Sequence, residues 1–328
     1  MGKVNWLLVL SAVVAMLFGL YLALIRSGFV LPGGYMALSH AQVMVVGFLG
    51  SLIALERAVA IKKLWSYLAP PLLFIASFLS LYSPIFMLIG FVGALVMFGV
   101  FAYLMVRYGR RPQWVVMGVA ALLLAIGNLL YAFSVPITYV LHYWLMFLVL
   151  TIAGERLELS ILLIPKRGVM GTFYIPVILS VIGVISGSGV IIGISYILLA
   201  LWLFYYDVAT RNLRASGLVR FVALTLMLGY VWLALGGIAL ILNLPYDLRI
   251  HAITLGFVFS MIFAHAPIIF PAILGGRSRF SPLLYLPVVL LHLSLIVRFT
   301  YDLKVGAVLG VIAILLYFAL MRFRVITF

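Results

Sequence analysis

Long hydrophobic runs, separated by short polar turns, make up nearly the whole chain. A helix that crosses a bilayer needs about 20 such residues. The runs predict an all-α membrane protein, one polytopic domain over residues 1–328, with about twelve spans at 5–25, 35–60, 66–82, 84–106, 113–134, 136–163, 171–187, 189–208, 218–243, 248–274, 281–301 and 304–323. The third and seventh spans are the weakest, because Pro70, Pro71 and Pro176 interrupt them.

Composition supports this interpretation and places the chain in a cell membrane. Hydrophobic residues make up 67% of the chain and charged residues 8%, against about 25% charged residues in soluble domains. The net charge of +15 suggests a nucleic-acid partner at first. With the N-terminus inside, however, all of the 21 Lys and Arg residues lie on the inner side except Arg26, Arg249, Arg298 and Lys304. This bias predicts cytoplasmic N- and C-termini and contact with anionic lipid, and it gives no support to nucleic acid.

The histidines indicate an internal repeat. His40, His142 and His251 stand near the outer ends of the second, sixth and tenth spans, at similar intervals along the chain. Two of these spans also end alike, in Leu-Glu-Arg-Ala (55–58) and Gly-Glu-Arg-Leu (154–157). The pattern predicts three four-helix units, roughly 1–110, 111–215 and 216–328, related by a pseudo-threefold axis. Membrane proteins built from repeats place their sites where the repeats meet.

His40 and His251 are the strongest candidate pair. Equal depth on parallel helices suits two axial ligands of one b-type haem, and small residues such as Gly47 and Gly256 would leave room for a macrocycle. The alternative is a pair of interfacial histidines bonded to carbonyls, because small residues also mark close helix packing. Arg298, at a similar depth, is either a partner for a haem propionate or an arginine that reaches the outer headgroups.

His142, His292 and His265 are candidates for a second metal centre. Imidazole suits copper and iron, and each ring could equally be a satisfied buried histidine. Fourteen helical steps of about 100° bring His265 to within about 40° of the direction of His251. The rise of about 1.5 Å per residue separates the two by on the order of 20 Å, so they cannot share one metal. The absence of cysteine excludes disulfides, iron–sulfur clusters and covalently attached haem.

Other polar residues within or beside the spans carry weaker signals. Glu56, Glu155 and Glu158 at inner helix ends are either a proton entry route or members of ion pairs. We assign Asn128 and Tyr230 to hydrogen bonds between packed helices. The remaining carboxylates are assigned to span ends: Asp207, Asp247 and Asp302.

Two segments resemble the NnrS family and, more distantly, subunit I of the haem-copper oxidases. They are His40-Ala-Gln-Val-Met-Val-Val-Gly-Phe-Leu-Gly50, followed by Leu55-Glu-Arg-Ala58, and the stretch from His251 to Pro267. The resemblance implies haem b and copper, a link to nitric oxide, and an electron donor such as a quinol or a cytochrome. By this resemblance His40 and His251 match low-spin haem ligands, His142 matches a copper ligand on the sixth helix, and Arg298 lies where oxidases hold propionates.

The chain also departs from the oxidases. The span 171–187 has no histidine, the tenth span has no His-X-His pair, and the sixth lacks the oxidase tyrosine motif. A proton-pumping terminal oxidase is therefore not expected. The predicted function is a membrane b-type haem protein for electron transfer or for redox handling of nitric oxide or oxygen, a candidate oxidoreductase. The alternatives are a transporter with a histidine-lined proton or metal-ion path, and a haem-bearing subunit of a partner enzyme.

Overall fold

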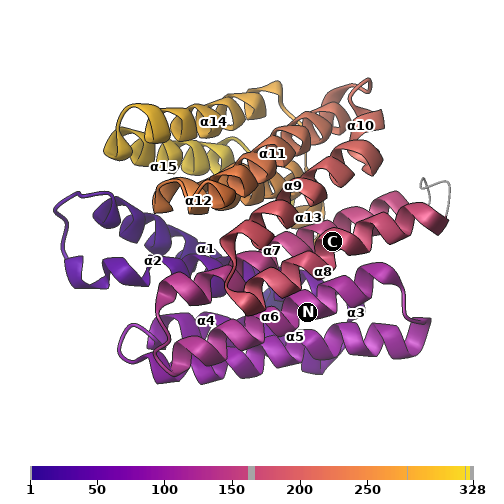
Figure 1. Ribbon diagram of the computed structural model, residues 1–328, viewed down its shortest axis with the longest axis horizontal. Coiled ribbons are helices and arrows are strands. Elements are labelled where there is room, and N and C mark those ends of the chain that lie inside the picture. The colour runs from indigo at the N-terminus through magenta and orange to yellow at the C-terminus, as the bar shows by residue number, and fades with distance from the viewer. Residues whose placement is uncertain (1, 162–166, 279, 322, 326–328) are drawn as a thin grey trace. The chain divides into compact units, whose positions relative to one another are not determined.

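The computed structural model describes residues 2–161, 167–278, 280–321 and 323–325, and helices make up most of that length (Figure 1). The chain forms two compact units. Unit 1 comprises Met1–Thr151 with Ala272–Gly275, and unit 2 comprises Ile152–Pro271 with Gly276–Phe328. Some residues that the sequence pattern places on the inner side lie outside the described residues: Lys166, Arg279 and Arg322. The end of the predicted span 136–163 lies outside them too.

Unit 1 is a bundle of helices joined by tight turns. Its α-helices are α1 (Gly2–Arg26), α2 (His40–Gln42), α3 (Ser51–Ile61), α4 (Ala69–Leu79), α5 (Met87–Tyr108), α6 (Pro112–Ala132) and the first part of α7 (Ile137–Ser160). Three 3₁₀ turns connect them: η1 (Gly34–Ser39), η3 (Leu64–Leu68) and η4 (Pro84–Phe86). A π-helix, η2 (Val43–Gly50), joins α2 to α3 and packs against α1 and α4.

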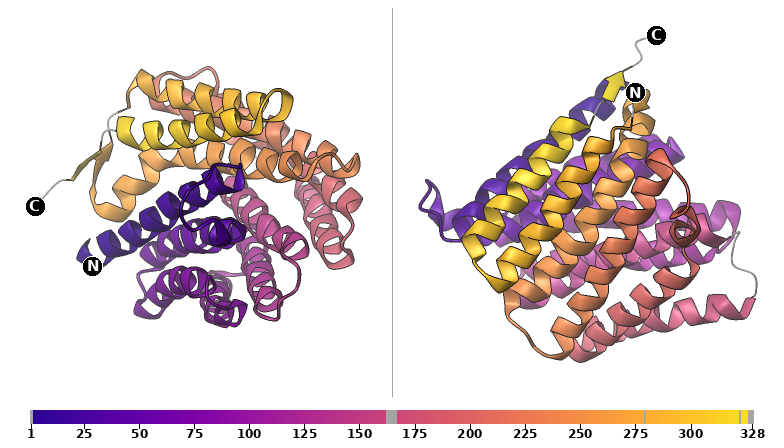
Figure 2. Two further views of the ribbon diagram at one scale, coloured as in Figure 1. Left: turned by 90° about the vertical axis from the view of Figure 1, so that its left-hand side faces the viewer. Right: turned by 90° about the horizontal axis from the view of Figure 1, so that it is seen from above.

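Unit 2 is also a bundle of helices and contains a second π-helix. Its α-helices are the last part of α7, α8 (Arg167–Ser186), α9 (Gly189–Tyr206), α10 (Val208–Asn212), α11 (Gly217–Ile241), α12 (Tyr246–His251), α13 (Ser260–Leu274), α14 (Tyr285–Thr300) and α15 (Leu303–Leu320). The π-helix η6 (Ala252–Phe259) joins α12 to α13, and the 3₁₀ turn η7 (Pro282–Leu284) precedes α14. Figure 2 shows α14 and α15 side by side. The short strands β1 (Gly276–Ser278) and β2 (Phe323–Val325) pair antiparallel.

Within the described residues, ten helical segments are long and apolar enough to cross a membrane, which confirms a multi-span helical membrane protein. They are Lys3–Arg26, Gly34–Ile61, Pro84–Tyr108, Pro112–Ala132, Ile137–Ser160, Gly189–Tyr206, Gly217–Ile241, Tyr246–Leu274, Pro282–Thr300 and Leu303–Leu320. The weakest predicted spans, 66–82 and 171–187, correspond to the shorter apolar helices Leu64–Leu79 and Met170–Ser186. The predicted arrangement of twelve spans in three units remains a prediction, because the helices group into two units.

The prolines behave differently from the interruptions that the sequence predicted. Pro70 and Pro71 lie in the first turn of α4, where a missing N–H group has no helical partner to lose. They therefore start this helix instead of breaking it. Pro176 does lie inside α8, and the Ser180 hydroxyl donates to its carbonyl oxygen at 2.8 Å.

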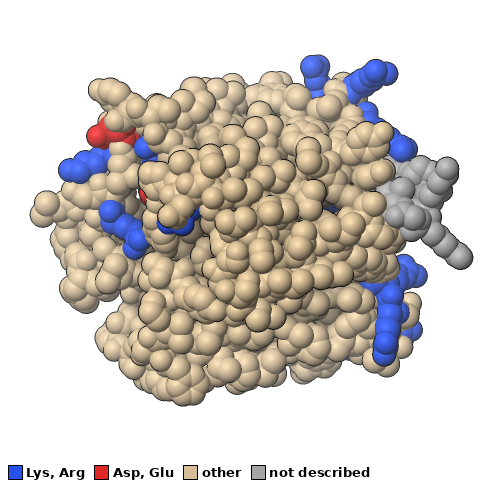
Figure 3. Space-filling model, viewed as in Figure 1, with Lys and Arg blue, Asp and Glu red and all other residues tan. Residues whose placement is uncertain are grey.

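Apolar residues cover the outward faces of the helices. On α8 the exposed side chains Ile175, Ile178, Ile182 and Ile185 follow one another at three- and four-residue spacing, which places them on one helix face. In the view of Figure 3, Lys and Arg side chains lie toward helix ends, and uncharged residues cover most of the surface between them. These surfaces fit a hydrocarbon environment, so lipid is the expected neighbour.

Two glycines allow a close backbone contact between α9 and α11 in unit 2. A methyl group on Gly193 of α9 would overlap the carbonyl oxygen of Gly237 on α11, and one on Gly237 would lie 2.6 Å from the Gly193 oxygen. Because both obstacles are backbone atoms, neither can turn aside. We predict that Gly193→Ala or Gly237→Ala lowers the free energy of unfolding by about 1–3 kcal/mol, measured by thermal unfolding in detergent.

Gly171→Ala on α8 is the matched control, because nothing lies within 4 Å of its added methyl group. This control should unfold at the wild-type temperature or slightly above it. Equal unfolding temperatures for all three variants would show that α9 and α11 are not in tight backbone contact.

Candidate functional site

His40 and His251 each lead into a π-helix, a feature that the sequence did not reveal. His40 begins the three-residue helix α2 directly before η2, and His251 ends α12 directly before η6. π-helices are rare, and they occur frequently at functional sites. His142, the third histidine of the predicted repeat, lies on α7, which is α-helical over its described length. Both histidines of the predicted pair thus lie close to a π-helix, and their role as ligands stays a prediction.

Each of these imidazoles is anchored through Nδ1. The His40 Nδ1 lies 2.9 Å from the carbonyl oxygen of Gly19 on α1. The His251 Nδ1 lies 3.0 Å from the carbonyl oxygen of Asp247, one turn earlier. Carbonyls only accept, so Nδ1 is protonated in both rings. This confirms the carbonyl contacts expected of interfacial histidines, and it is also how ligating histidines are normally fixed while Nε2 binds the metal.

Asp247 and Arg298 extend the anchor of His251 into a three-residue cluster of unit 2. The Asp247 carboxylate lies 3.0 Å from His251 Nδ1. The Arg298 guanidinium donates to both carboxylate oxygens at 2.6 Å, from Nε and from Nη2. Arg298 is therefore bound by an acidic residue that the sequence assigned only to a span end. Its predicted partner, a haem propionate, would have to share this guanidinium with Asp247.

Side chains of neighbouring helices fill the space beside the glycines near the two histidines. A methyl group on Gly47 would overlap the Ser77 hydroxyl, and one on Gly256 would overlap the indole ring of Trp232. The expectation that these two positions leave room for a macrocycle is therefore wrong. They let neighbouring helices approach the π-helices closely, which is the other reason for small residues at membrane helix contacts.

His292 is held by Trp232 in a way that disfavours metal binding. The indole N–H of Trp232 donates to His292 Nδ1 at 2.8 Å, and the two rings are nearly parallel. An indole can only donate, so Nδ1 uses its lone pair and the neutral ring carries its proton on Nε2. That Nε2 is buried and has no hydrogen-bond partner among the described residues. In this tautomer His292 is a hydrogen-bond donor and not a ligand.

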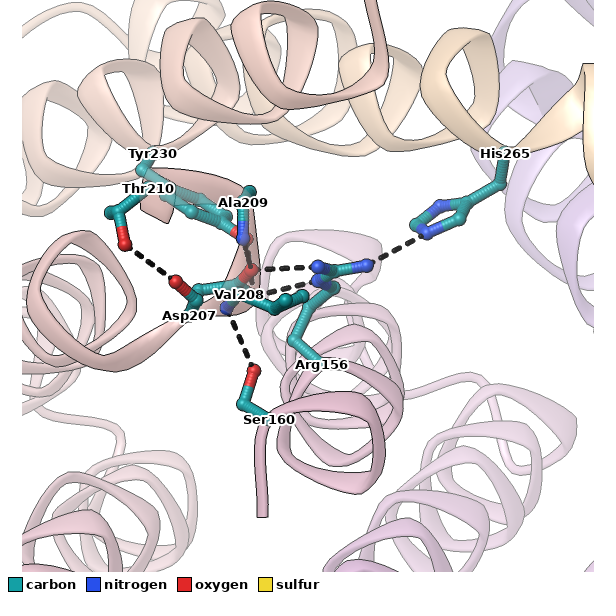
Figure 4. A network of polar contacts seen from close by, with 8 residues as sticks. All are labelled: Arg156, Ser160, Asp207, Val208, Ala209, Thr210, Tyr230 and His265. Atoms are coloured by element: carbon teal, nitrogen blue, oxygen red, sulfur yellow. Dashed lines mark hydrogen bonds and ion pairs between the residues drawn. The ribbon is translucent and has the colours of Figure 1, made fainter. Parts of the chain in front are cut away.

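His265 belongs to a buried network around an ion pair (Figure 4). The Arg156 guanidinium donates to both oxygens of Asp207 at 2.6 Å, from Nε and from Nη2. Its Nη1 donates to His265 Nε2 at 3.2 Å, and the Tyr230 hydroxyl donates to Asp207 at 2.9 Å. The side chains of Arg156 and Asp207 are 3% and 0% exposed. The network joins α7, α9, α11 and α13, because Asp207 is the residue between α9 and α10.

The hydrogen-bond partners of His265 determine which of its ring nitrogens carries the proton. Arginine can only donate, so His265 Nε2 accepts, and the proton lies on Nδ1, which donates to the Met261 carbonyl oxygen at 2.9 Å. Both ring nitrogens are engaged. His265 is thus a half-buried histidine with both nitrogens satisfied, close to the alternative that the sequence left open, and it has no nitrogen to offer a second metal.

His251 and His265 also engage different neighbours, although the α-helical spacing predicted one shared face. His251 contacts Asp247 and through it Arg298 on α14, while His265 contacts Arg156 on α7. The prediction used 100° per residue throughout. That step does not hold across the eight π-helical residues of η6, where each turn takes more residues.

The remaining predicted residues follow simpler patterns. Glu56 pairs with its neighbour Arg57 at 3.0 Å, as the ion-pair interpretation expected, and Arg156 pairs with Asp207 at 2.6 Å. The Trp144 indole donates to Asn128 at 3.0 Å, which confirms a helix-packing role. Unit 1 holds His40 and His142, and unit 2 holds the other three histidines. Over the described ranges, no three His, Asp or Glu residues gather closely enough to hold a metal ion.

Comparison with known proteins assigns the chain to one family. A family model described as "Domain of unknown function (DUF8744)" matches residues 5–326, so the chain belongs to that family. No curated protein and no solved structure matches it. A function must therefore be argued from the side chains themselves.

The buried ion pair yields a direct stability test. Asp207→Asn keeps the size of the side chain but removes its charge, which leaves Arg156 buried without a counter-charge. We predict a loss of about 3–5 kcal/mol in the free energy of unfolding, the usual cost of breaking such a pair. Thermal or denaturant unfolding of the purified protein in detergent measures it.

Asp302→Asn is the matched control, because Asp302 caps α15 through a hydrogen bond from the Val305 N–H and Asn caps a helix equally well. Its stability should stay within a few tenths of a kcal/mol of wild type. If both variants behave alike, Asp207 is not the counter-charge of Arg156.

Proposed function

We propose that the protein is a multi-pass membrane protein that binds b-type haem, with His40 and His251 as the candidate axial ligands. The observation that carries the proposal is the feature these two histidines share. Each lies within three residues of the start of a π-helix and has its Nδ1 bonded to a backbone carbonyl. A neutral imidazole held through Nδ1–H has its basic lone pair on Nε2, the atom that haem iron binds.

The residues around His251 suit the hydrogen-bond partners that orient a metal-binding histidine. Asp247 accepts from the imidazole, and Arg298 holds the carboxylate in place through two hydrogen bonds. A carboxylate behind a ligating histidine fixes the ring and raises its basicity. Asp247 and Arg298 therefore orient His251, and the backbone carbonyl of Gly19 has the same function for His40.

Haem, when bound, would supply one-electron transfer, and a small gas such as nitric oxide or oxygen would bind the iron only in place of one of the two histidines. A quinol or a cytochrome is the class of electron donor that such a protein needs. Copper is left out of the proposal: both ring nitrogens of His265 are hydrogen-bonded, His292 accepts at Nδ1 and carries its proton on Nε2, and His142 alone makes no site. The likeness to the NnrS family rests on the same two histidine segments.

The proposal includes an orientation in the cell membrane. Both termini face the cytoplasm, and the two shorter apolar helices complete twelve spans in three repeats. The strong inner bias of Lys and Arg supports this orientation. Reporter fusions at the loops after residues 26 and 108 would test it, because the first should lie outside and the second inside.

One observation favours a second candidate, a transporter with a proton path. Unit 2 carries ionisable or imidazole groups in three separate clusters: Asp247–His251, Trp232–His292 and Arg156–Asp207–His265. Ionisable groups within membrane spans often mark such a path. Bound haem distinguishes the two candidates, since a transporter of this kind needs none.

The axial assignment predicts a loss of haem from ligand variants. His40→Ala and His251→Ala should each lower the haem-to-protein ratio well below wild type, because each removes one iron–nitrogen bond. Pyridine haemochrome analysis of protein purified from haem-supplied cells measures the ratio. His292→Gln is the control and should keep its haem, because His292 offers no lone pair. Full haem content in both alanine variants contradicts the assignment.

The orienting role of Asp247 can be tested separately. Asp247→Asn removes the carboxylate behind His251 and should weaken haem binding about 10–100-fold, the usual effect of such partners. Transfer of haem to a soluble haem-binding competitor measures the change, with Asp302→Asn as the control for the same substitution. Wild-type retention in Asp247→Asn would mean that Asp247 does not position a ligand, even if His251 is one.

A further inference from the structure

Cationic side chains lie over aromatic rings where α3, η3 and α5 contact one another in unit 1. The Lys63 ammonium, directly before η3, lies 5.9 Å from the centre of the Tyr103 ring on α5. The Arg107 guanidinium lies 6.0 Å from the centre of the same ring, and its Nη1 donates to the Tyr103 hydroxyl at 2.8 Å. The Trp65 ring packs edge-on against Tyr103, with ring centres 6.3 Å apart. One tyrosine thus holds two cations from different segments of the chain.

The same arrangement continues into α6. Arg107 also lies 5.6 Å from the ring centre of its neighbour Tyr108. The Tyr108 ring packs against Trp114 of α6 with ring centres 6.0 Å apart, and the Arg111 guanidinium lies 5.1 Å from the Trp114 ring centre. An aromatic face attracts a cation within about 6 Å. The rings therefore link three cations into one group, here called the cation cluster: Lys63, Arg107 and Arg111.

Unit 1 has too little negative charge to balance the cation cluster. The three side chains of the cluster are exposed, and so are Lys62 and Arg110, which adjoin them in the chain. By its sequence, unit 1 contains one carboxylate, Glu56, and that carboxylate forms an ion pair with Arg57. A single carboxylate cannot balance all of these cations. This end of unit 1 therefore carries a net positive charge that attracts an anion.

The position of the cation cluster selects the kind of anion. The membrane span of α5 ends at Tyr108 and that of α6 begins at Pro112, so the cluster lies at span ends, where Tyr and Trp side chains meet lipid headgroups. Leu64 and Val106 beside it are apolar, yet they are 84% and 88% exposed. A phospholipid suits both features. Its phosphate binds the cations, since guanidinium groups match phosphate geometry, and its acyl chains cover the apolar side chains.

Single-stranded nucleic acid also binds through basic and aromatic side chains, but it fits this surface less well. Its bases stack on exposed aromatic faces. Here cations already lie over the rings of Tyr103, Tyr108 and Trp114, and Trp114 is only 8% exposed. A soluble polyanion would also leave Leu64 and Val106 in water. The chemistry therefore favours lipid.

We propose that the cation cluster binds the phosphate group of one anionic phospholipid, whose acyl chains lie against Leu64 and Val106. The general bias of Lys and Arg along the sequence predicts only diffuse attraction to anionic lipid. The aromatic rings hold the cluster at one place in unit 1, so one lipid is bound there in preference to the others around the protein. The inference is independent of haem binding.

Mass spectrometry of intact protein–lipid complexes tests the site in the delipidated full-length protein. Titration with phosphatidylglycerol or phosphatidylcholine gives the dissociation constant of the first lipid bound, and phosphatidylglycerol should bind more tightly. Lys63→Gln and Arg107→Gln should each weaken its binding about fivefold, the usual contribution of one cation near an anionic surface. Lys3→Gln is the matched control, because Lys3 is an exposed lysine of unit 1 outside the cluster. It should leave the dissociation constant unchanged.

Several results would overturn the proposal. Equal affinities for the two lipids, or equal weakening by Lys3→Gln and Lys63→Gln, would mean diffuse attraction only. Tighter binding of a single-stranded uridine oligonucleotide than of phosphatidylglycerol would assign the cation cluster to nucleic acid instead.

Tyr103→Leu tests the geometry of the cation cluster without a change of charge. It removes the ring that holds Lys63 and Arg107 and should weaken phosphatidylglycerol binding. Thermal unfolding identifies a folded variant, and wild-type affinity in folded Tyr103→Leu contradicts the proposal.

Discussion

The ion pair between Arg156 and Asp207 is the constraint on which unit 2 depends. A charge within a membrane span is costly unless it is paired and hydrogen-bonded, and here every neighbour contributes to that end. Tyr230 donates to the carboxylate, His265 accepts from the guanidinium, and the Ala209 N–H donates to Asp207 at 2.6 Å. These contacts come from α7, α10, α11 and α13. These hydrogen bonds hold the four helices together, and removing any one group would leave another group without its partner.

Near the two π-helices, too, hydrogen bonds and helix packing together fix where the side chains lie. In both units a π-helix follows a histidine that is anchored through Nδ1. A glycine in each π-helix also lies against a side chain of a neighbouring helix, Gly47 against Ser77 and Gly256 against Trp232. Trp232 in turn fixes His292. The small residues therefore serve helix packing, and the histidines owe their orientation to carbonyls and to Asp247. A metal site built this way would be preorganised before its ligand arrives.

The architecture could be predicted because it depends on the length of apolar runs, which the sequence displays directly. The pairing of His40 with Gly19 or of Arg156 with Asp207 could not, because the partners are far apart in sequence and no local pattern connects them. One signal was available for Asp207. A chain with six acidic residues and a basic residue inside a span must provide that basic residue with a counter-charge. The spacing of apolar residues along the sequence does not reveal the π-helices. Because η6 lies between His251 and His265, the shared helix face predicted from 100° per residue does not follow.

The most direct test of the haem assignment is a visible difference spectrum of the purified wild-type protein, reduced with dithionite minus oxidised, recorded with and without carbon monoxide or nitric oxide. The assignment predicts sharp b-type bands. Bands unmoved by gas would mean that both axial positions are filled, as with His40 and His251 together, and bands that shift would mean an open position and gas chemistry. The absence of any haem bands from protein made in haem-supplied cells would contradict the assignment and leave the proton-path transporter as the better description.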